Sequence, residues 1–231
     1  MSPWMLRLDD RRSPDVHMPV DEAAAREAAW SVRWFCWEPA AVSLGLKQPA
    51  PAWVAASRAE GLACVERPTG GGLAFHGTDV SIAVVIPQAM EVPLGALMAA
   101  VCRSAASLCL SYGLEAWADL DAGAGNARVT YCLAEPSPYA VYAGRRKLAG
   151  FALRRYRHSW LVQGSLLVRP IPGELLARMP GPAAAQLAAH AVSLSEAVGA
   201  PLSEQDVKRR WAAHWTAWWE AKLMPRLEVA A

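Results

Sequence analysis

The order of strand-like and helical segments is the feature that most constrains how this chain can fold. Short alternating or β-branched runs, typical of strands, both precede and follow one long helical apolar stripe over 94–113. The runs lie at 32–37, 41–46, 62–66, 73–75, 79–86, 114–118, 129–133, 139–143, 148–153 and 161–168. Because strands and helices do not alternate strictly, this order predicts an α+β fold with mixed or antiparallel sheets flanked by helices, not a doubly wound parallel sheet.

The chain is predicted to form a single domain over residues 1–231. It is long enough to bury a large core without disulfides, and 54% of its residues are apolar. No internal repeat or flexible linker divides it. Prolines at positions 3, 14 and 19 predict an irregular segment up to residue 20, with Asp21 capping a helix that runs to about Ala29. A further helix is expected over 51–61, and residues 174–223 are expected to be helical.

Charge and cysteine usage exclude several classes of function. The 23 basic and 21 acidic residues leave a net charge of only +2, so no nucleic-acid partner is expected. The sequence has no run of about 20 uncharged apolar residues and no apolar signal segment, so we expect a soluble cytoplasmic protein without a membrane partner. The five cysteines include no Cys-x-x-Cys pair, which argues against a disulfide framework and against a metal site.

A glycine-rich turn between two predicted strands is one candidate binding site. It reads Arg67-Pro68-Thr69-Gly70-Gly71-Gly72 and is followed by Leu73-Ala74-Phe75-His76. The N–H groups of such a turn can hold an anion or a carbonyl oxygen, and Arg67 is expected to supply charge for a phosphate. It is not a P-loop, because no lysine follows the glycines. An ordinary hairpin turn is the alternative.

Cys132 and Lys147 form a second candidate site. Lys147 lies in the segment 144–150, where a lysine beside a glycine can donate to a developing oxyanion. Cys132 follows a predicted strand and is expected to lie across a hairpin from Arg145, Arg146 and Lys147, whose charges would stabilise a thiolate. The alternatives are a solvated basic hairpin and a buried, reduced cysteine.

In this order, the segments resemble the superfamily of lipoate-protein ligases and octanoyltransferases, which includes the catalytic domain of biotin protein ligases. The resemblance is carried by 18–22, 33–45 with Gln48, 67–76, 144–152 and 163–167. These segments span residues 18–168, and the predicted helices of about 174–223 fit the C-terminal part of the family. The resemblance implies a biotin/lipoate protein ligase fold, which is similar to that of class II aminoacyl-tRNA synthetases.

The resemblance also implies roles for individual residues. Cys132 and Lys147 would be catalytic, with Lys147 on the acyl carbonyl. The acyl group or ligand would be bound by Arg67, Thr69, Gly70, Gly71, Gly72, His76, Gly150, Ala152, Gly164 and Ser165. Cys132 lies 15 residues before Lys147 and begins a Cys-x-x-x-Pro-Ser-x-Tyr pattern. This spacing and pattern are similar to those of the cysteine-dependent octanoyltransferases in the superfamily.

The reaction implied by this class needs neither a metal nor a cofactor. Cys132 would take an octanoyl or lipoyl group from acyl carrier protein as a thioester, and a lysine of a lipoyl domain would then receive it as an amide. One alternative is a lipoate- or octanoate-protein ligase, which uses ATP and magnesium. The third glycine of the turn, Gly72, is similar to the pattern of these ligases. The other is a catalytically degenerate scaffold that binds a carrier or lipoyl domain.

Two departures from the family pattern motivate the scaffold alternative. The family's His-Asp is His76-Gly77 here, and Phe151 stands where a small residue usually borders the pocket, which would change the length or identity of the acyl group. A basic cluster is expected to steer acidic carrier or lipoyl domains, with a solvated strand face as the alternative. The cluster consists of Arg145, Arg146, Lys147, Arg154, Arg155 and Arg157.

Overall fold

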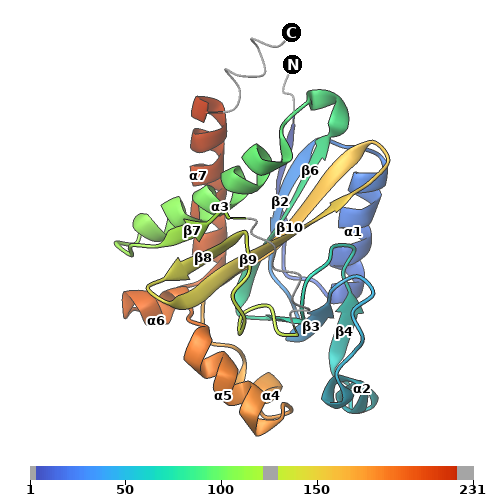
Figure 1. Cartoon of the computed structure of the whole chain (residues 1–231), viewed down its shortest axis with the longest axis vertical. Coiled ribbons are helices and arrows are strands. Elements are labelled where there is room, and N and C mark those ends of the chain that lie inside the picture. Colours follow the sequence, from blue (N-terminus) through green and yellow to red (C-terminus); the bar gives the residue numbers. More distant parts are fainter. Residues whose placement is uncertain (1–3, 122–129, 223–231) are drawn as a thin grey trace.

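The computed structural model describes residues 4–121 and 130–222, and a mixed β-sheet runs through its centre (Figure 1). In the described ranges this sheet has seven strands in the order β1-β2-β6-β10-β9-β8-β7. Their bounds are β1 Met5–Leu8, β2 Ser31–Phe35, β6 Asp79–Pro87, β10 Ser159–Leu167, β9 Arg146–Arg155, β8 Ala140–Ala143 and β7 Trp117–Asp119. Neighbouring strands pair antiparallel except β1 and β2, which are parallel. The predicted α+β class is confirmed.

A smaller sheet lies beside the central one and carries the glycine-rich turn. It is formed by β4 (Ala63–Glu66), β3 (Ala41–Leu44) and β5 (Ala74–His76), with β3 in the middle. β3 is parallel to β4 and antiparallel to β5. Residues 67–73 therefore connect its two outer strands, and the short turn after β5 leads directly into β6 of the central sheet.

Helices cover both faces of the central sheet (Figure 1). α3 (Leu94–Leu110) and α7 (Glu204–Lys222) pack on one face, and α1 (Pro14–Arg26) packs on the other beside β4. α3 buries Leu97, Met98, Val101, Ala105 and Leu108, the helical stripe that its sequence predicted. The remaining helices are α2 (Ala52–Ala59), η1 (Gln88–Met90), α4 (Gly173–Leu176), α5 (Gly181–His190) and α6 (Leu194–Val198). Across the described residues, no helix is both long and apolar enough to span a bilayer.

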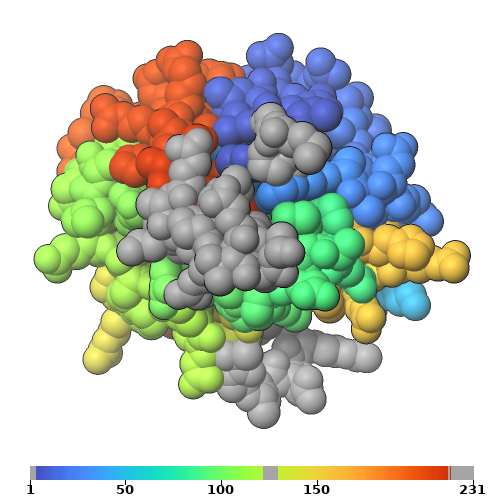
Figure 2. Space-filling view, turned by 90° about the horizontal axis from the view of Figure 1, so that it is seen from above, coloured from blue at the N-terminus to red at the C-terminus, as the bar shows by residue number. Residues whose placement is uncertain are grey.

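The N-terminal segment differs from the prediction. Residues up to 20 were expected to be irregular, but β1 forms there and α1 begins at Pro14 rather than at Asp21. Proline is tolerated in the first turn of a helix, where its missing N–H would have no partner anyway, and Pro19 is accommodated further along. β1 lies against α7 (Figure 2), where the ring of Trp4, just before it, is 5.5 Å from that of Trp219.

The prediction of a strand over 129–133 is also wrong for residues 130–133, which the structure describes. Val129 lies outside the described residues, Tyr131 makes only an isolated bridge to Leu73, and a turn begins at Cys132. The carboxylate of Glu135 holds this turn by accepting from the N–H groups of Thr130 (2.8 Å) and Tyr131 (3.2 Å). The strand predicted over 114–118 begins only at Trp117, as β7.

A buried ionic network joins α1 to the central sheet. Arg33 of β2 donates to Asp21 at 2.6 and 3.0 Å and to Asp9 at 3.0 Å. Asp21 also accepts from Gln163 of β10 at 2.7 Å. Removing one partner of such a pair would leave a buried charge unpaired and cost about 3–5 kcal/mol. The network therefore fixes where α1 crosses the strands that line the cavity described below.

His17, a member of this network, gives a prediction about acid stability. Its ring is fully buried, accepts from Arg33 at Nδ1 and donates to the Cys36 carbonyl from Nε2 at 2.9 Å. Burial, aided by the Arg33 charge, lowers its pKa from 6.5 to about 4. The unfolded chain therefore takes up this proton at higher pH than the folded one. The stabilisation is complete above pH 6.5 and is lost as the pH falls through 4.

We therefore expect the free energy of unfolding to fall by roughly 2 kcal/mol from pH 7 to pH 4.5 because of His17. Urea unfolding of the wild type and of His17→Gln at both pH values measures this difference. Glutamine can still accept from Arg33 and donate to Cys36, but it does not titrate. An equal loss of stability in both proteins would show that His17 does not set this acid sensitivity.

Candidate active site

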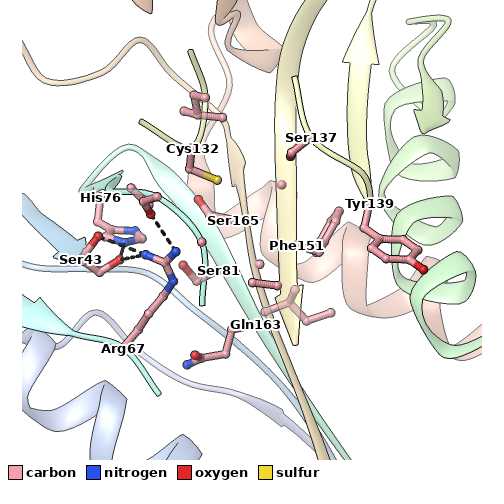
Figure 3. Close-up of a pocket in the computed structure, with 18 of the residues that line it drawn as sticks. Ser43, Arg67, His76, Ser81, Cys132, Ser137, Tyr139, Phe151, Gln163 and Ser165 are labelled. Atoms are coloured by element: carbon pink, nitrogen blue, oxygen red, sulfur yellow. Dashed lines mark hydrogen bonds between the residues drawn. The ribbon is translucent and has the colours of Figure 1, made fainter. Parts of the chain in front are cut away.

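A cavity of about 220 Å³ lies between the two sheets, α1, α3 and the segment 132–139 (Figure 3). It is larger than the roughly 150 Å³ apolar cavity that admits benzene. Its apolar lining includes Met18, Phe35, Trp37, Phe75, Ile82, Met98, Leu133 and Phe151. Its polar side chains are Ser43, Arg67, His76, Ser81, Cys132, Ser137, Tyr139, Gln163 and Ser165. An apolar cavity with a few convergent polar groups is typical of a small-molecule site.

Arg67 is buried beneath the glycine-rich turn and holds its shape. Its guanidinium donates to the carbonyl oxygens of Gly70 and Gly72, both at 2.7 Å, and of Ser43 at 3.1 Å. Burial lowers the pKa of Arg67, although an arginine keeps its charge in proteins. The guanidinium is thus held by the protein's own carbonyls and by Ser43 Oγ (3.3 Å), and the expectation that it offers charge to a phosphate stays a prediction.

The turn packs too closely for side chains. A Cβ on Gly45 would lie 1.9 Å from the Gly71 carbonyl oxygen, and Gly71 has a φ of +95°. Gly71 and Gly72 line the cavity, and no residue in the described ranges accepts a hydrogen bond from the N–H groups of Gly70, Gly71 or Gly72. The use of these N–H groups by a ligand oxygen stays a prediction of the sequence.

The structure brings Cys132 and Lys147 together. A Cβ placed on Gly150 would lie 3.1 Å from the Cys132 sulfur and 3.7 Å from Lys147 Nζ, so both side chains use the space that this glycine leaves open. Lys147 is buried and donates to Ser137 Oγ at 2.6 Å and to the Glu135 carbonyl at 3.2 Å. Cys132 is half-buried and lines the cavity (Figure 3).

Other candidate residues are placed differently. Arg145 on the turn and Arg146 at the start of β9 are both exposed, so they do not share the buried position of Lys147. Thr69 and Gly70 do not line the cavity, but Thr69 Oγ1 donates to Gln163, which does (2.8 Å). The remaining residues predicted to bind the ligand all line it: Arg67, Gly71, Gly72, His76, Gly150, Ala152, Gly164 and Ser165.

His76 belongs to a buried polar unit that the sequence did not predict. Its Nε2 lies 2.8 Å from Ser43 Oγ, and its Nδ1 lies 2.9 Å from Asp79 Oδ2. Its ring stacks on Trp37 with centroids 3.9 Å apart. Asp79 also accepts from Ser81 Oγ, Ser165 Oγ and the Gly77 N–H. Burial alone would raise the pKa of Asp79, but His76 and these donors bring it below its ordinary value.

The two departures from the family pattern have structural partners. Asp79, three residues after His76, supplies the carboxylate that the His-Gly dipeptide lacks. Gly77 has a φ of +116°, and a Cβ there would lie 3.0 Å from Ala40. Phe151 occupies the space above Gly164, where a Cβ would be 2.0 Å from Phe151 Cδ1. The spacing of His76 and Asp79 was the one sequence signal that could have revealed the first pair.

The chain is similar to a family model and to individual known proteins over most of its length. A family model described as the lipoyl protein ligase A/B catalytic domain matches residues 13–216. Octanoyltransferase LipM of Symbiobacterium thermophilum is 31% identical over 234 aligned positions, which cover 91% of this chain and 84% of that protein. Octanoyltransferase LipM of Kyrpidia tusciae is 28% identical over 247 positions, covering 97% and 90%.

Solved structures share the fold. Lipoate-protein ligase A bound with ATP superposes with a TM-score of 0.74 at 18% identity, covering 94% of this chain and 85% of that one. A bi-partite lipoate protein ligase of Thermoplasma acidophilum gives 0.72 at 16% identity, covering 95% and 85%. Biotin protein ligase of Aquifex aeolicus gives 0.51 at 9% identity, covering 96% and 71%. The fold expected from the sequence is thus confirmed, and this protein belongs to the family of lipoyl protein ligase A/B catalytic domains.

Proposed function

We propose that this protein is an octanoyltransferase that carries the acyl group as a thioester on Cys132 and delivers it to a lysine of a lipoyl domain. The observation that carries the proposal is the meeting of Cys132 and Lys147 over Gly150, on the wall of an apolar cavity. Relatives named octanoyltransferase LipM, which align with most of the chain, support the transferase class.

Formation of the thioester uses the groups around Gly150. Cys132 gives up its thiol proton to water, and its thiolate attacks the carbonyl carbon of an octanoyl thioester on acyl carrier protein. The carbon–sulfur bond to the carrier breaks, and the departing carrier thiolate takes up a proton from water in return. Lys147 Nζ shares the space over Gly150 with the Cys132 sulfur, which places a hydrogen-bond donor beside the reacting centre. The free N–H groups of the glycine-rich turn are suited to the oxyanion, and the apolar walls to the alkyl chain.

Transfer to the acceptor regenerates the cysteine. The neutral ε-amine of a lipoyl-domain lysine attacks the Cys132 thioester, the carbon–sulfur bond breaks, and the acyl group leaves as an amide. One solved relative in fold is a lipoate protein ligase described together with its E2 lipoyl domain, which supports an acceptor of this kind. The sequence of bond changes consumes no ATP and needs no metal ion.

An ATP-dependent ligase is the alternative, and the relatives that align with most of the chain favour the transferase because they are named octanoyltransferases. The scaffold alternative also loses its motivation, because Asp79 pairs with His76 and Gly164 makes room for Phe151.

Intact-mass spectrometry after incubation with octanoyl acyl carrier protein tests the nucleophile. We expect one octanoyl adduct on the wild type and none on Cys132→Ala. Lys147→Met should form the adduct about 100-fold more slowly, because the donor beside the reacting centre is lost. Cys64→Ala is the matched control, since Cys64 is also a half-buried free cysteine but lies outside the cavity.

Two outcomes would contradict this proposal. A wild type that never carries the acyl group would exclude the thioester route. Octanoylation of a lipoyl domain by Cys132→Ala, supplied with ATP and free octanoate, would show a ligase instead.

Phe151 gives a prediction about chain length. Its ring narrows the cavity over Gly164, so a smaller side chain there should admit longer acyl groups. We expect Phe151→Leu to shift the preference toward longer donors by about tenfold, as one or two methylenes in an apolar pocket typically do. Competition between carrier proteins charged with chains of different length measures this shift. Leu153→Ala, which enlarges the same cavity away from Gly164, serves as the comparison, and an equal shift there would contradict a specific role for Phe151.

A further inference from the structure

The proposed reaction needs a base that Cys132 and Lys147 do not provide. An acceptor lysine normally carries a proton at neutral pH, with a pKa near about 10.4, and only its neutral amine attacks a thioester. Lys147 Nζ donates to Ser137 and to the Glu135 carbonyl, and Lys147 is not among the residues that line the cavity. A group that does line the cavity is therefore better placed to take the proton of the incoming amine.

The unit of Ser43, His76 and Asp79 has the arrangement of such a base. The distances are 2.8 Å from Ser43 Oγ to His76 Nε2 and 2.9 Å from His76 Nδ1 to Asp79 Oδ2. The three residues come from β3, β5 and β6 and are at most 4% exposed. Ser43 and His76 line the same cavity as Cys132 (Figure 3), whereas Asp79 is not among the lining residues.

The hydrogen-bond partners set the direction of proton transfer. Asp79 accepts hydrogen bonds from Ser81, Ser165 and the Gly77 N–H, so the His76 Nδ1 that faces it is a donor, and Nε2 of the neutral ring is then the acceptor. Arg67 Nη1 donates to Ser43 Oγ at 3.3 Å. Among the described residues, the hydroxyl hydrogen of Ser43 then has His76 Nε2 as its acceptor. A proton that reaches Ser43 Oγ from the cavity can thus pass to His76.

The ring of His76 is held rigidly enough for this task. It stacks on Trp37 at 3.9 Å, and Trp37 itself donates to Ser81 Oγ at 2.8 Å. Ser81 in turn donates to Asp79 at 3.0 Å, which closes a ring of contacts around the imidazole. The orientation of the base is therefore fixed before a substrate arrives, which removes that cost from the reaction.

We infer that Ser43, His76 and Asp79 form a proton relay that deprotonates the acceptor lysine in the second half of the proposed reaction. The inference rests on the proposed function for its substrate. Ser43 contacts the incoming ammonium, His76 takes the proton, and Asp79 positions and balances the resulting imidazolium.

The protons and electrons of the step balance as follows. The ammonium gives one proton to Ser43 Oγ while the Ser43 hydroxyl hydrogen moves to His76 Nε2. The amine lone pair forms the carbon–nitrogen bond, and the carbon–sulfur bond breaks with its electron pair on Cys132. The second proton lost from nitrogen goes to that sulfur, one hydrogen remains on the amide, and His76 later releases its proton to water.

Separate measurement of the two half-reactions tests the relay. The octanoyl enzyme is prepared first and then mixed with lipoyl domain, and the loss of the adduct is followed by intact mass across pH. We expect Ser43→Ala and His76→Gln to slow this loss about 100-fold, at least tenfold more than they slow adduct formation. In the wild type the rate should rise with pH through one titration that Ser43→Ala abolishes. Ser43→Thr, which keeps the hydroxyl, should recover most of the rate.

Ser104→Ala is the matched control. Ser104 is a fully buried serine in α3 that accepts from Trp211 at 3.0 Å and lies outside the cavity. It should match the wild type in both half-reactions, and thermal unfolding of all variants shows that they fold.

Each failure has its own signature. If the wild type forms the octanoyl enzyme and folded Ser43→Ala discharges it at the wild-type rate with the same pH profile, the relay is wrong and the proposed function stands. An octanoyl ester on Ser43 in Cys132→Ala would overturn the relay by making Ser43 a nucleophile. Failure of the wild type to form any adduct overturns both proposals.

Discussion

A buried arginine charge without a described carboxylate partner shapes the whole ligand side of this protein. Arg67 keeps its charge, and its guanidinium donates to the carbonyls of Ser43, Gly70 and Gly72. In a trans peptide the N–H points away from the carbonyl of the same unit, so turning the Gly70 carbonyl toward Arg67 turns the Gly71 N–H away from it. The carbonyls that hold the buried guanidinium therefore also decide which way the N–H groups of the turn point. The turn comes so close to Gly45 that a Cβ on that residue would have no room.

The prediction of the fold succeeded where the signal was local. The strands β2 to β6 and β8 to β10 and the helices α2 and α3 appear at or near their predicted positions, because periodicity and flanking prolines or glycines define them. β1 carries no such signal, since all four of its residues are exposed and only its pairing with β2 makes it a strand. Tyr131 and Leu133 alternate like a strand, but they are buried against a separate apolar cluster without a ladder of partners.

The candidate site could be predicted only in part, for a related reason. Cys132 and Lys147 belong to recognisable segments, and a glycine at 150 leaves the space in which they meet. Ser43, His76 and Asp79 come from three strands, and the register that pairs Ala41 with His76 and Asp79 with Leu167 brings them together. Gly77 and Phe151 look like losses when each is compared alone with the family pattern. Each is matched by another residue of the same chain, Asp79 in one case and Gly164 in the other.

The two halves of the proposed chemistry rest on supports of different stiffness. The base is carried by three paired strands and held by a stacked tryptophan, whereas the nucleophile lies on a turn outside any strand. That turn is fixed by the Glu135 carboxylate at its start and by Lys147 at its end, since Nζ binds both the Glu135 carbonyl and Ser137. In the proposed reaction Lys147 would therefore serve the thiol twice, as a donor beside the reacting centre and as the anchor of the turn that carries Cys132. Because the same Nζ would do both, the donor is in place over Gly150 only when the turn is held there.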